Sequence, residues 1–588
     1  MGLFQKAIET YDAMESLAGV KVENKETLAP VGYMITEAKL EITIDADGNF
    51  VRARKISEKI PIPCTEKSSG RSNSPVAHPL CDKLEYVAEI DNEKHSVYLD
   101  EVKSWKESKF SNPKIDAIYS YLIKNTVLKD CEKSNVLKID NKGKIKEKDD
   151  IVTWRVEGLG ENSGAVHEDH QLMRLYLDYY LNNKKFAEGV CMVTGKKECL
   201  AEQHLKGVSS FSGNAKLISS NDNDGFTYRG RFVDGGEAMS MGYMASQKAH
   251  NALKWLLSNN GVSMGERRIV CWNPQGRKIP EFNLPILSKL PDKVEPSDYK
   301  KQLQLVLNGY KSNLPEQDTV VIASFEAATS GRLSVAYYNE LQRSDFLERL
   351  YYWDTTCCWN DNRWGVQSPA IYEIIKYAFG TQRDNGKVEC DEKLISQHMQ
   401  RLVSCRIDKA LFPVDIMRNL VVKASNLQVY KGNNADRLLF ITCAVIKKFR
   451  YDNYKEEWKM ALDENLPDRS YQFGRLLAVL EKIENDTYKD ESRETNAIRA
   501  QAFYVQRPLT AFSQIMTGLK TGYYPRLSEG TKIYYEQLIG SIMEKISILD
   551  NGEIDKPLKE TYLMGYYLQK NSLYTKKETN NNQGIEEE

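Results

Sequence analysis

The sequence lacks the cysteine spacings that disulfide frameworks and zinc fingers need. Its eleven cysteines are scattered between Cys64 and Cys443, and no C-x-x-C pair occurs among them. This scatter predicts reduced, mostly buried thiols of a cytoplasmic protein. Cys191, Cys199 and His204 match no common zinc finger, because their spacings are too irregular. We therefore expect neither a metal site nor a cofactor.

Long hydrophobic runs and an excess of one charge are also missing. The longest apolar run, from Leu438 to Ile446, has nine residues, whereas a helix that crosses a bilayer needs about 20. Lys6 and Glu9 precede any apolar run, so the N-terminus is unlike a signal peptide. The net charge of -1 argues against nonspecific duplex binding over the whole surface. The sequence predicts a soluble cytoplasmic protein without membrane contact, in which any nucleic-acid contact comes from local patches.

Catalytic and nucleotide-binding motifs are absent as well. No G-x-x-x-x-G-K-[ST] sequence occurs, and the glycines between 158 and 164 miss the G-x-G-x-x-G spacing. The run from His167 to His170 lacks H-E-x-x-H spacing, so a polar helix start is favoured over a metal site. No G-x-S-x-G and no His-Asp dipeptide is present. We expect a protein that is not an enzyme, with an intrinsic nuclease as the alternative.

The 588 residues exceed one hydrophobic core and suggest roughly three or four units. Alternating segments at 40–56, around Asp47-Gly48, and at 319–325 and 333–338 predict strands. From about residue 366 apolar residues recur at intervals of three and four, which predicts helices. The fold class is therefore α+β, a mixed α/β N-terminal region followed by an all-α helical bundle. Further helices are predicted at 3–17, 165–182 and 247–257. The predicted domain division is an N-terminal α/β region (1–150), a central α/β region (151–365) and a C-terminal helical bundle (366–588).

Three segments carry chemistry suited to nucleic acids. Residues 191–232 fit no helix or strand period and end with interleaved aromatics and arginines (Phe226, Tyr228, Arg229, Arg231, Phe232), which suits phosphates and stackable bases. Residues 61–79, rich in proline and serine, predict a long polar loop, and long ordered loops tend to be functional. Seven Lys or Arg between Arg52 and Lys83 form a basic patch, for which a solvated hairpin face is the alternative.

Several blocks in a fixed order resemble a known family. They are TEKSSGRSNSPVAHPLCDKLEYV (65–87), CMVTGKK, HLKGV and SGNAKLISSNDNDGFTYRGRF (within 191–232), ATSGRLSVAYYNEL (328–341), and FGRLLAVLEKIEND, LIGSIMEKI and MGYYLQK near the end. The chain resembles the large subunit of type I-C CRISPR interference complexes (Cascade), the family written Cas eight c or Csd one. The linking segments depart from the family, including the Lys-rich run at 133–148.

The resemblance implies a non-catalytic subunit of a crRNA-guided surveillance complex in antiviral defence. Such a subunit recognises the protospacer-adjacent motif (PAM) on double-stranded DNA, helps open the duplex, stabilises the R-loop and helps recruit a helicase-nuclease. Protein then reads the PAM while base pairing reads the remaining target. The implied partners are the crRNA-bearing Cascade backbone and crRNA-end-capping subunits, a small subunit made from the same gene, the target DNA and the helicase-nuclease. The alternative is a structural scaffold whose neighbours read the DNA.

Under this resemblance, residues 65–79 are expected to enter a groove at the PAM. Gly70 permits close backbone approach, Arg71 or Lys67 contacts a phosphate or a guanine edge, and Ser72 and Asn73 read base edges. A loop that braces a neighbouring subunit is the rival interpretation. The expected PAM contacts are Lys67, Ser69, Gly70, Arg71, Ser72 and Asn73. The expected DNA-backbone contacts are Arg229, Arg231, Arg267 and Arg268 and, as exposed residues of the C-terminal bundle, Arg475, Arg499, Arg507, Lys520 and Arg526.

The C-terminal block resembles the small subunit, which in this family can be made from a start site inside the large-subunit gene. Met460 precedes this block, and a start there would give a product of 129 residues, 460–588. An ordinary internal methionine is the alternative.

Overall fold

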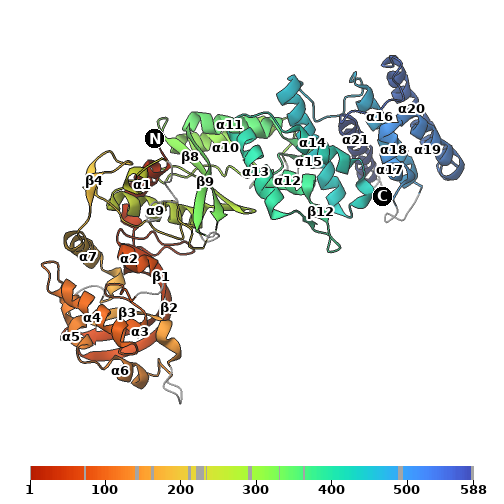
Figure 1. The fold of residues 1–588 in the computed structure, drawn as a ribbon. Coiled ribbons are helices and arrows are strands. Elements are labelled where there is room, and N and C mark those ends of the chain that lie inside the picture. Colours follow the sequence, from red (N-terminus) through yellow and green to blue (C-terminus); the bar gives the residue numbers. More distant parts are fainter. Residues whose placement is uncertain are drawn as a thin grey trace. The chain divides into compact units, whose positions relative to one another are not determined.

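The computed structural model describes residues 2–71, 75–138, 145–160, 164–209, 213–219, 231–233, 235–288, 294–329, 331–361, 365–487 and 494–583, without the side chains of residues 328 and 575–583 (Figure 1). The chain folds into two compact units. Unit 1 combines Met1–Arg277 with Thr319–Glu340, and unit 2 combines Lys278–Asp318 with Leu341–Glu588. The mixed α/β first part and the mostly helical last part are as predicted. The division at residues 150 and 365 stays a prediction.

A three-stranded sheet of order β2-β1-β3 organises one lobe of unit 1. Strand β1 (Tyr33–Asp45) pairs antiparallel with β2 (Phe50–Pro63) and parallel with β3 (Ile151–Glu157). Gly48 forms the turn at φ +73°, and an added Cβ would lie 2.6 Å from the Ala117 carbonyl oxygen. Glycine is therefore required there, and the predicted hairpin is confirmed. The helices of this lobe are α3 (Leu84–Val87), α4 (Asn92–Lys106), α5 (Pro113–Leu122), α6 (Val127–Lys133) and α7 (His170–Asn183).

The start of α7 lies in the predicted polar segment between His167 and His170. Asp169 caps the helix by accepting a hydrogen bond from the Leu172 backbone N–H at 2.9 Å. The same carboxylate pairs with the buried Lys114 ammonium at 2.8 Å. An N-cap acceptor satisfies one of the free N–H groups of the first turn. The interpretation of this segment as a helix start is confirmed.

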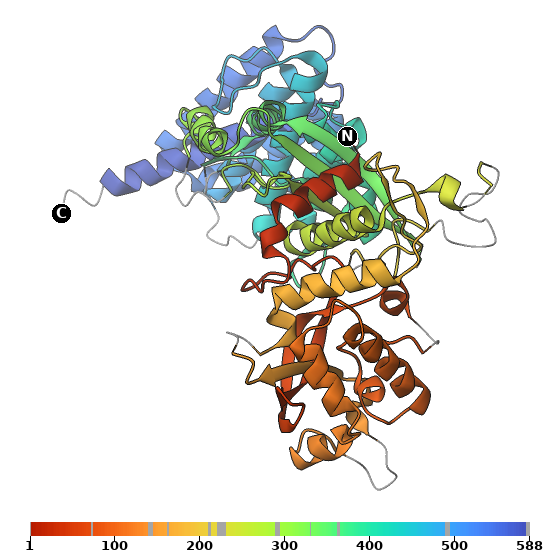
Figure 2. The ribbon, with the colours of Figure 1, turned by 90° about the vertical axis from the view of Figure 1, so that its left-hand side faces the viewer.

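A four-stranded sheet of order β6-β7-β8-β9 organises the rest of unit 1. Its strands are β6 (Val262–Met264), β7 (Arg267–Trp272), β8 (Thr319–Thr329) and β9 (Arg332–Gln342). Helices α1 (Leu3–Ala13) and α9 (Tyr243–Asn260) lie side by side and pack against this sheet (Figures 1 and 2). The Trp272 indole N–H donates to Thr10 Oγ1 at 2.9 Å and so ties β7 to α1. The predicted helices and strands of this region are confirmed, with longer bounds for α9, β8 and β9 and a shorter one for the helix predicted at 3–17, which ends at Ala13.

Unit 2 is mainly a helical array, and its part after residue 366 is mostly helical, as predicted, apart from one short hairpin. Its helices are α10 (Tyr299–Asn313), α11 (Arg343–Thr356), α12 (Ile371–Phe379), α13 (Glu392–Ile407), α14 (Val414–Ala424), α15 (Asn433–Tyr454), α16 (Arg469–Asn485), α17 (Asn496–Arg499), α18 (Gln501–Gln506), α19 (Pro508–Gly522), α20 (Glu529–Ile548) and α21 (Tyr562–Gln583). Two short hairpins join them, β10 (Trp359–Asp361) with β11 (Gly365–Gln367) and β12 (Thr381–Gln382) with β13 (Val388–Glu389). Within the part that the structure describes, no helix is long and apolar enough to cross a membrane.

Helix α16 is the centre of the last part of unit 2. The apolar stripe predicted from the sequence, including Phe473, Leu477 and Ile483, is fully buried. Helices α19, α20 and α21 pack around α16, so nearly all its residues are buried. A helix buried on every side has no solvent face for charged residues.

Candidate nucleic-acid interface

The segment predicted to contact the PAM begins with a short helix instead of a loop. Residues 61–63 complete β2, and α2 (Glu66–Gly70) follows at once. Thr65 caps α2 by accepting a hydrogen bond from the Ser68 backbone N–H at 3.0 Å. The prediction of a continuous loop over 61–79 is therefore wrong for these residues. Composition indicated the turn residues but could not show that Thr65 starts a helix.

A buried carboxylate fixes α2 to the central block of the sequence. The Glu66 side chain accepts the backbone N–H groups of Glu202 and Gln203 at 2.9 and 3.1 Å, and it pairs with Lys184. Charge-assisted hydrogen bonds to backbone N–H groups are among the stronger ones in proteins. Two segments that the sequence singled out separately, residues 65–79 and 191–232, therefore lie next to each other.

Arg71 closes the segment after α2. Its guanidinium contacts the Asp82 carboxylate at 2.7 and 2.5 Å and donates to the Val76 carbonyl at 2.7 Å. The guanidinium carbon also lies 4.4 Å from the centre of the Tyr86 ring. Asp82 is fully buried and accepts the His78 backbone N–H at 2.7 Å. In this arrangement Arg71 is occupied by contacts within the protein, and a DNA contact by Arg71 stays a prediction.

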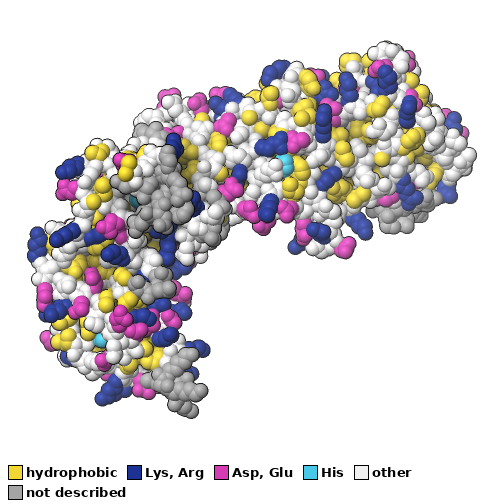
Figure 3. Space-filling model, in the orientation of Figure 1, with side chains coloured by type: hydrophobic (Ala, Val, Ile, Leu, Met, Phe, Trp, Pro, Cys, Tyr) yellow, Lys and Arg dark blue, Asp and Glu magenta, His cyan; other side chains and the backbone are white. Residues whose placement is uncertain are grey.

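Ion pairs neutralise most of the basic patch between residues 52 and 83. The pairs are Arg52–Glu157, Arg54–Glu41, Lys55–Glu147, Lys59–Glu26, Arg71–Asp82 and Lys83–Asp149. Basic and acidic side chains are likewise interspersed over the visible surface (Figure 3). Lys67 is exposed and forms no ion pair with any residue that the structure describes. It is the member of the patch whose charge remains available to a phosphate.

The other predicted PAM residues lie around Lys67. Ser69 and Gly70 are half-buried at the end of α2, where a Cβ on Gly70 would lie 3.4 Å from Gln203 Oε1. Ser72 and Asn73 lie outside the described residues. Their proposed contact with base edges stays a prediction.

Three further basic residues meet where the central block reaches the β8–β9 hairpin. Lys206 and Lys216 are partners in an antiparallel bridge, and Lys216 is bridged in parallel to Arg332. The Lys216 backbone N–H donates to the Gly331 carbonyl at 3.1 Å, and the Leu333 N–H donates to the Lys216 carbonyl at 3.0 Å. We call Lys206, Lys216 and Arg332 the basic cluster. Among described residues, none of the three has an ion-pair partner.

The electrostatics of the basic cluster favour an anion. Burial and the nearby charge of Lys206 lower the pKa of the Lys216 ammonium. Two ammonium groups without a carboxylate between them repel each other, and a bound phosphate would relieve this repulsion. Sequence periodicity could not identify this cluster, because its members come from three separate blocks. The available signal was that all three lie in blocks shared with the family, HLKGV, SGNAKL and ATSGRL.

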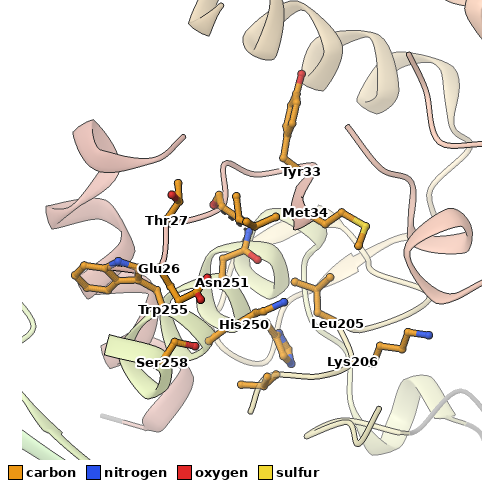
Figure 4. Close-up of a pocket in the computed structure, with 14 residues that line it drawn as sticks. Glu26, Thr27, Tyr33, Met34, Leu205, Lys206, His250, Asn251, Trp255 and Ser258 are labelled. Atoms are coloured by element: carbon orange, nitrogen blue, oxygen red, sulfur yellow. Dashed lines mark hydrogen bonds between the residues drawn. The ribbon is translucent and has the colours of Figure 1, made fainter. Parts of the chain in front are cut away.

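A cavity of about 50 Å³ lies beside Lys206. Leu205 and Lys206 line it from the central block, and His250, Asn251 and Trp255 line it from α9 (Figure 4). This volume accommodates a few water molecules and excludes a nucleotide base.

Two neutral histidines support the wall of this cavity. His250 Nδ1 lies 2.7 Å from the Ser246 carbonyl oxygen and so carries the ring proton, whereas Nε2 is buried without a described partner. His204 Nδ1 lies 2.8 Å from Ser246 Oγ. Burial lowers the pKa of His250 to about 4 and that of His204 to about 3. Both rings are therefore neutral at pH 7.

The remaining residues of unit 1 that were predicted to contact the DNA backbone differ in how exposed they are. Arg231 is exposed. Arg267 is half-buried and pairs with Glu326 at 2.9 Å, and Arg268 is also half-buried. Arg229 lies outside the described residues. Among the described arginines of this set, Arg231 is the most accessible.

Among the predicted contacts in unit 2, the expectation that Arg475 is exposed is wrong. Arg475 is fully buried in α16, where its Nε donates to Gln569 Oε1 and its Nη1 to Gln472 Oε1, both at 2.9 Å. The reason is that neighbouring helices surround α16, which the sequence stripe alone does not show. Exposed positions are confirmed for Arg499, Arg507, Lys520 and Arg526.

Met460 lies in the segment that joins α15 to α16. It is half-buried and packs on a small apolar cluster that includes Tyr299, Leu303 and Cys358. Its sulfur lies 3.9 Å from the Cys358 sulfur. Because α16 begins only at Arg469, a product that starts at Met460 contains α16 to α21 entire.

A family comparison accounts for the order of the blocks. Residues 9–574 match the family described as CRISPR-associated protein (Cas_Csd1). No curated protein matches the chain. The family match includes α2, the central block, the β8–β9 hairpin and the helices of unit 2 up to α21. The chain therefore belongs to the Csd1 family of CRISPR-associated proteins.

Proposed function

We propose that this chain is the non-catalytic large subunit of a crRNA-guided surveillance complex and that unit 1 recognises the PAM on target DNA. The observation that carries the proposal is that the central block contacts both α2, through Glu66, and the tip of the β8–β9 hairpin, through Lys216. Lys67 and the basic cluster lie on these segments without ion-pair partners among the residues described. Phosphate contacts position a protein on DNA, and contacts to base edges supply specificity.

In this proposal each group has a distinct role. Lys67 and the basic cluster hold phosphates, and Gly70 allows the backbone of α2 to approach a groove. Ser69, Ser72 and Asn73 are the candidates for base edges. The contact with the DNA backbone is extended by Arg231, Arg267 and Arg268. The opened strands are contacted by Arg499, Arg507, Lys520 and Arg526. Arg71 stays a candidate for a phosphate or guanine contact, and its pairing with Asp82 also sets the path of the segment.

The proposed partners follow from the family. The chain would assemble with crRNA-bearing backbone and crRNA-end-capping subunits, stabilise the R-loop and recruit a separate helicase-nuclease for cleavage. Sequence is then read mainly by base pairing, and the protein supplies PAM recognition. The alternative is a structural scaffold, in which a neighbouring subunit reads the PAM.

The deciding experiment compares guide-loaded complexes assembled with and without this chain. Each is tested for binding to a matched duplex that carries the PAM and to one in which the PAM is scrambled. Discrimination that requires the chain supports PAM recognition. Equal discrimination without the chain would reject the proposal and favour the scaffold alternative.

A variant test then locates the contact. We expect Lys67→Ala to weaken binding of the PAM duplex about 3- to 10-fold without affecting assembly, as expected for loss of one charged phosphate contact. Lys59→Ala is the matched control, since Lys59 is also exposed but pairs with Glu26. Equal effects of the two substitutions would argue against a specific role for Lys67.

We also propose that Met460 is an internal start that yields the small subunit. A start there preserves every helix from α16 onward. Replacing Met460 with Leu in the gene should abolish a C-terminal product of 129 residues and leave the full chain intact, as judged by immunoblotting of a C-terminal tag. Persistence of that product would show that Met460 is an ordinary internal methionine.

A further inference from the structure

Unit 2 contains a cavity much larger than the one beside Lys206. Its volume is about 290 Å³, and it is bounded by the start of α10, the end of α11, the end of α15 and residues 456–460. This volume is close to the lower end of the range for small-ligand sites. The cavity can therefore hold a group of about the size of one nucleotide.

Two aromatic side chains line this cavity. Tyr451 comes from the end of α15 and Trp458 from the segment that follows it, and both are half-buried. The Trp458 indole N–H donates to Glu456 Oε2 at 3.0 Å, which restricts the orientation of the ring. Arg450 pairs with the same carboxylate at 3.3 Å. An oriented aromatic ring on a cavity wall is suited to stacking with a planar base.

The charged groups of the lining favour an anion. Three lysines, Lys300, Lys447 and Lys459, line the cavity together with Glu456 and Glu457. Arg450 pairs with Glu456 but also with Glu560 at 2.9 Å, so it compensates the charge of Glu456 only in part. Lys459 pairs with Asp463 at 3.5 Å, which leaves Lys300 and Lys447 as the lysines of the lining without a carboxylate partner among the described residues. Lys300 is exposed and has no ion-pair partner in the described parts of the chain. An aromatic wall beside an unpaired ammonium group matches the two chemical parts of a nucleotide, its base and its phosphate.

Lys447 is held in place from the protein side. Its ammonium donates to the Thr355 carbonyl at 2.7 Å and lies 3.2 Å from the Cys358 sulfur. Burial raises the pKa of the Cys358 thiol, so the sulfur is neutral and does not cancel the lysine charge. Lys447 therefore adds fixed positive charge to the lining of the cavity.

We propose that this cavity binds one unstacked nucleotide, with the base against Trp458 or Tyr451 and the phosphate near Lys300. The nucleotide belongs either to a single strand or to a free nucleotide pool, and both share this chemistry. The site lies wholly in unit 2, so it does not depend on PAM recognition by unit 1. A product that starts at Met460 lacks Lys300, Tyr451 and Trp458 and cannot form it.

The test measures binding of a fluorescein-labelled ten-residue oligothymidylate to the purified full chain by fluorescence anisotropy. Trp458→Ala should weaken binding about 5- to 30-fold, the effect of losing one base-aromatic stack. Trp458→Phe retains an aromatic face and should recover most of the affinity. Lys300→Ala should weaken binding about 3- to 10-fold, and Lys301→Ala, at the next exposed position of α10 but outside the cavity lining, less than 2-fold.

Several outcomes would overturn the proposal. Unchanged affinity in Trp458→Ala is one, and equal losses in Lys300→Ala and Lys301→Ala are another. The lysine pair keeps the test valid even where Trp458→Ala disturbs folding, because both lysines are exposed. PAM discrimination by the assembled complex should remain unchanged in all four variants, which separates this site from the function proposed for unit 1.

Competition with thymidine monophosphate identifies the source of the nucleotide. If the monophosphate displaces the labelled oligonucleotide at concentrations similar to those of unlabelled oligothymidylate, and Trp458→Ala weakens this competition, the cavity binds free nucleotides. If only unlabelled oligothymidylate displaces the labelled oligonucleotide, and Trp458→Ala weakens this competition, the cavity binds a nucleotide within a strand. Both results support the cavity as a nucleotide site, whereas competition that is insensitive to Trp458→Ala contradicts it.

Discussion

Arg71 and Lys67 lie in the same predicted DNA-contact segment but have opposite environments. Arg71 contacts the buried Asp82 carboxylate, whereas Lys67 is exposed without a described ion-pair partner. Removing one partner of a buried ion pair leaves the other charge unpaired, which costs about 3–5 kcal/mol. We expect Arg71→Ala to lower the free energy of unfolding by about 3 kcal/mol and Lys67→Ala by less than about 0.5 kcal/mol, measured by urea titration.

A conservative substitution separates the charge of Arg71 from the geometry of its contact with Asp82. Arg71→Lys is the control for charge alone, since lysine cannot reproduce the two-pronged contact with Asp82. We expect it to recover only part of the lost stability. A stability of Arg71→Ala equal to that of the unsubstituted chain would show that the pair with Asp82 does not hold the segment.

The two buried histidines beside the small cavity predict a pH dependence. In the unfolded chain a histidine has a pKa of about 6.5, but in the fold His204 and His250 have pKa values of about 3 and 4. As pH falls below about 6.5, protons bind the unfolded state preferentially, so stability is lost progressively down to about pH 4 for His250 and about pH 3 for His204. Between pH 7.5 and 5.5 we expect a loss of about 1 kcal/mol for each histidine.

Urea titrations at these two pH values, following the transition of unit 1, test this expectation. The quantity compared is the change in the free energy of unfolding between the two pH values, so a substitution that alters stability equally at both does not affect the result. His250→Gln should show a shallower slope than the unsubstituted chain, because one proton-binding difference is removed. Identical slopes would mean that His250 is protonated to the same extent in both states.

At the scale of elements, glycines set the crossing of α16 and α21. A Cβ on Gly474 would overlap the backbone of Tyr562, and one on Gly565 would overlap the backbone of Tyr471. Both collisions are with backbone, so no side-chain rotation can relieve them. We expect Gly474→Ala to destabilise unit 2 by about 3 kcal/mol, measured by thermal or urea unfolding.

Gly518 provides the matched control for this crossing. It lies in α19 with nothing within 4 Å of an added Cβ, and replacing a helical glycine with alanine there should stabilise by up to about 1 kcal/mol. Changes of opposite sign in the free energy of unfolding would establish that close backbone contact, and not helix propensity, requires glycine at position 474. Destabilisation of similar size at both positions would contradict this.

Elements with a clear period or turn signal were predictable from the sequence. The Asp47-Gly48 hairpin and the stripe of α16 followed from local patterns. The pairing of Arg71 with Asp82 and the burial of Arg475 were not predictable, because each depends on what packs around the residue. Charge identifies a basic residue, but only the fold shows whether a carboxylate or a neighbouring helix already satisfies it.

The candidate site was predictable only in its parts. Composition and the family blocks drew attention to residues 65–79 and 191–232, but their adjacency through Glu66 depends on tertiary contacts. The basic cluster required the bridge between Lys216 and Arg332, more than 100 residues apart in sequence. Its identification therefore needed a structure, because no local pattern connects these segments.

At the scale of the whole molecule, a net charge of -1 means that DNA affinity must come from local positive charge. Binding to DNA releases counterions, and the logarithm of the binding constant falls with the logarithm of salt concentration by about 0.9 for each phosphate contact. If the basic cluster contacts phosphates, a triple alanine variant of Lys206, Lys216 and Arg332 should reduce this slope by about 2 to 3 in the assembled complex.

The control for this experiment must change the net charge by the same amount. Alanine at Arg52, Arg54 and Lys59 also removes three positive charges, but these side chains already pair with Glu157, Glu41 and Glu26. We expect this control to change the salt slope by less than about 1, because no phosphate contact is lost. Equal slopes for the two triple variants would mean that affinity follows the overall charge of the protein, and the basic cluster would then lose its role as the phosphate contact.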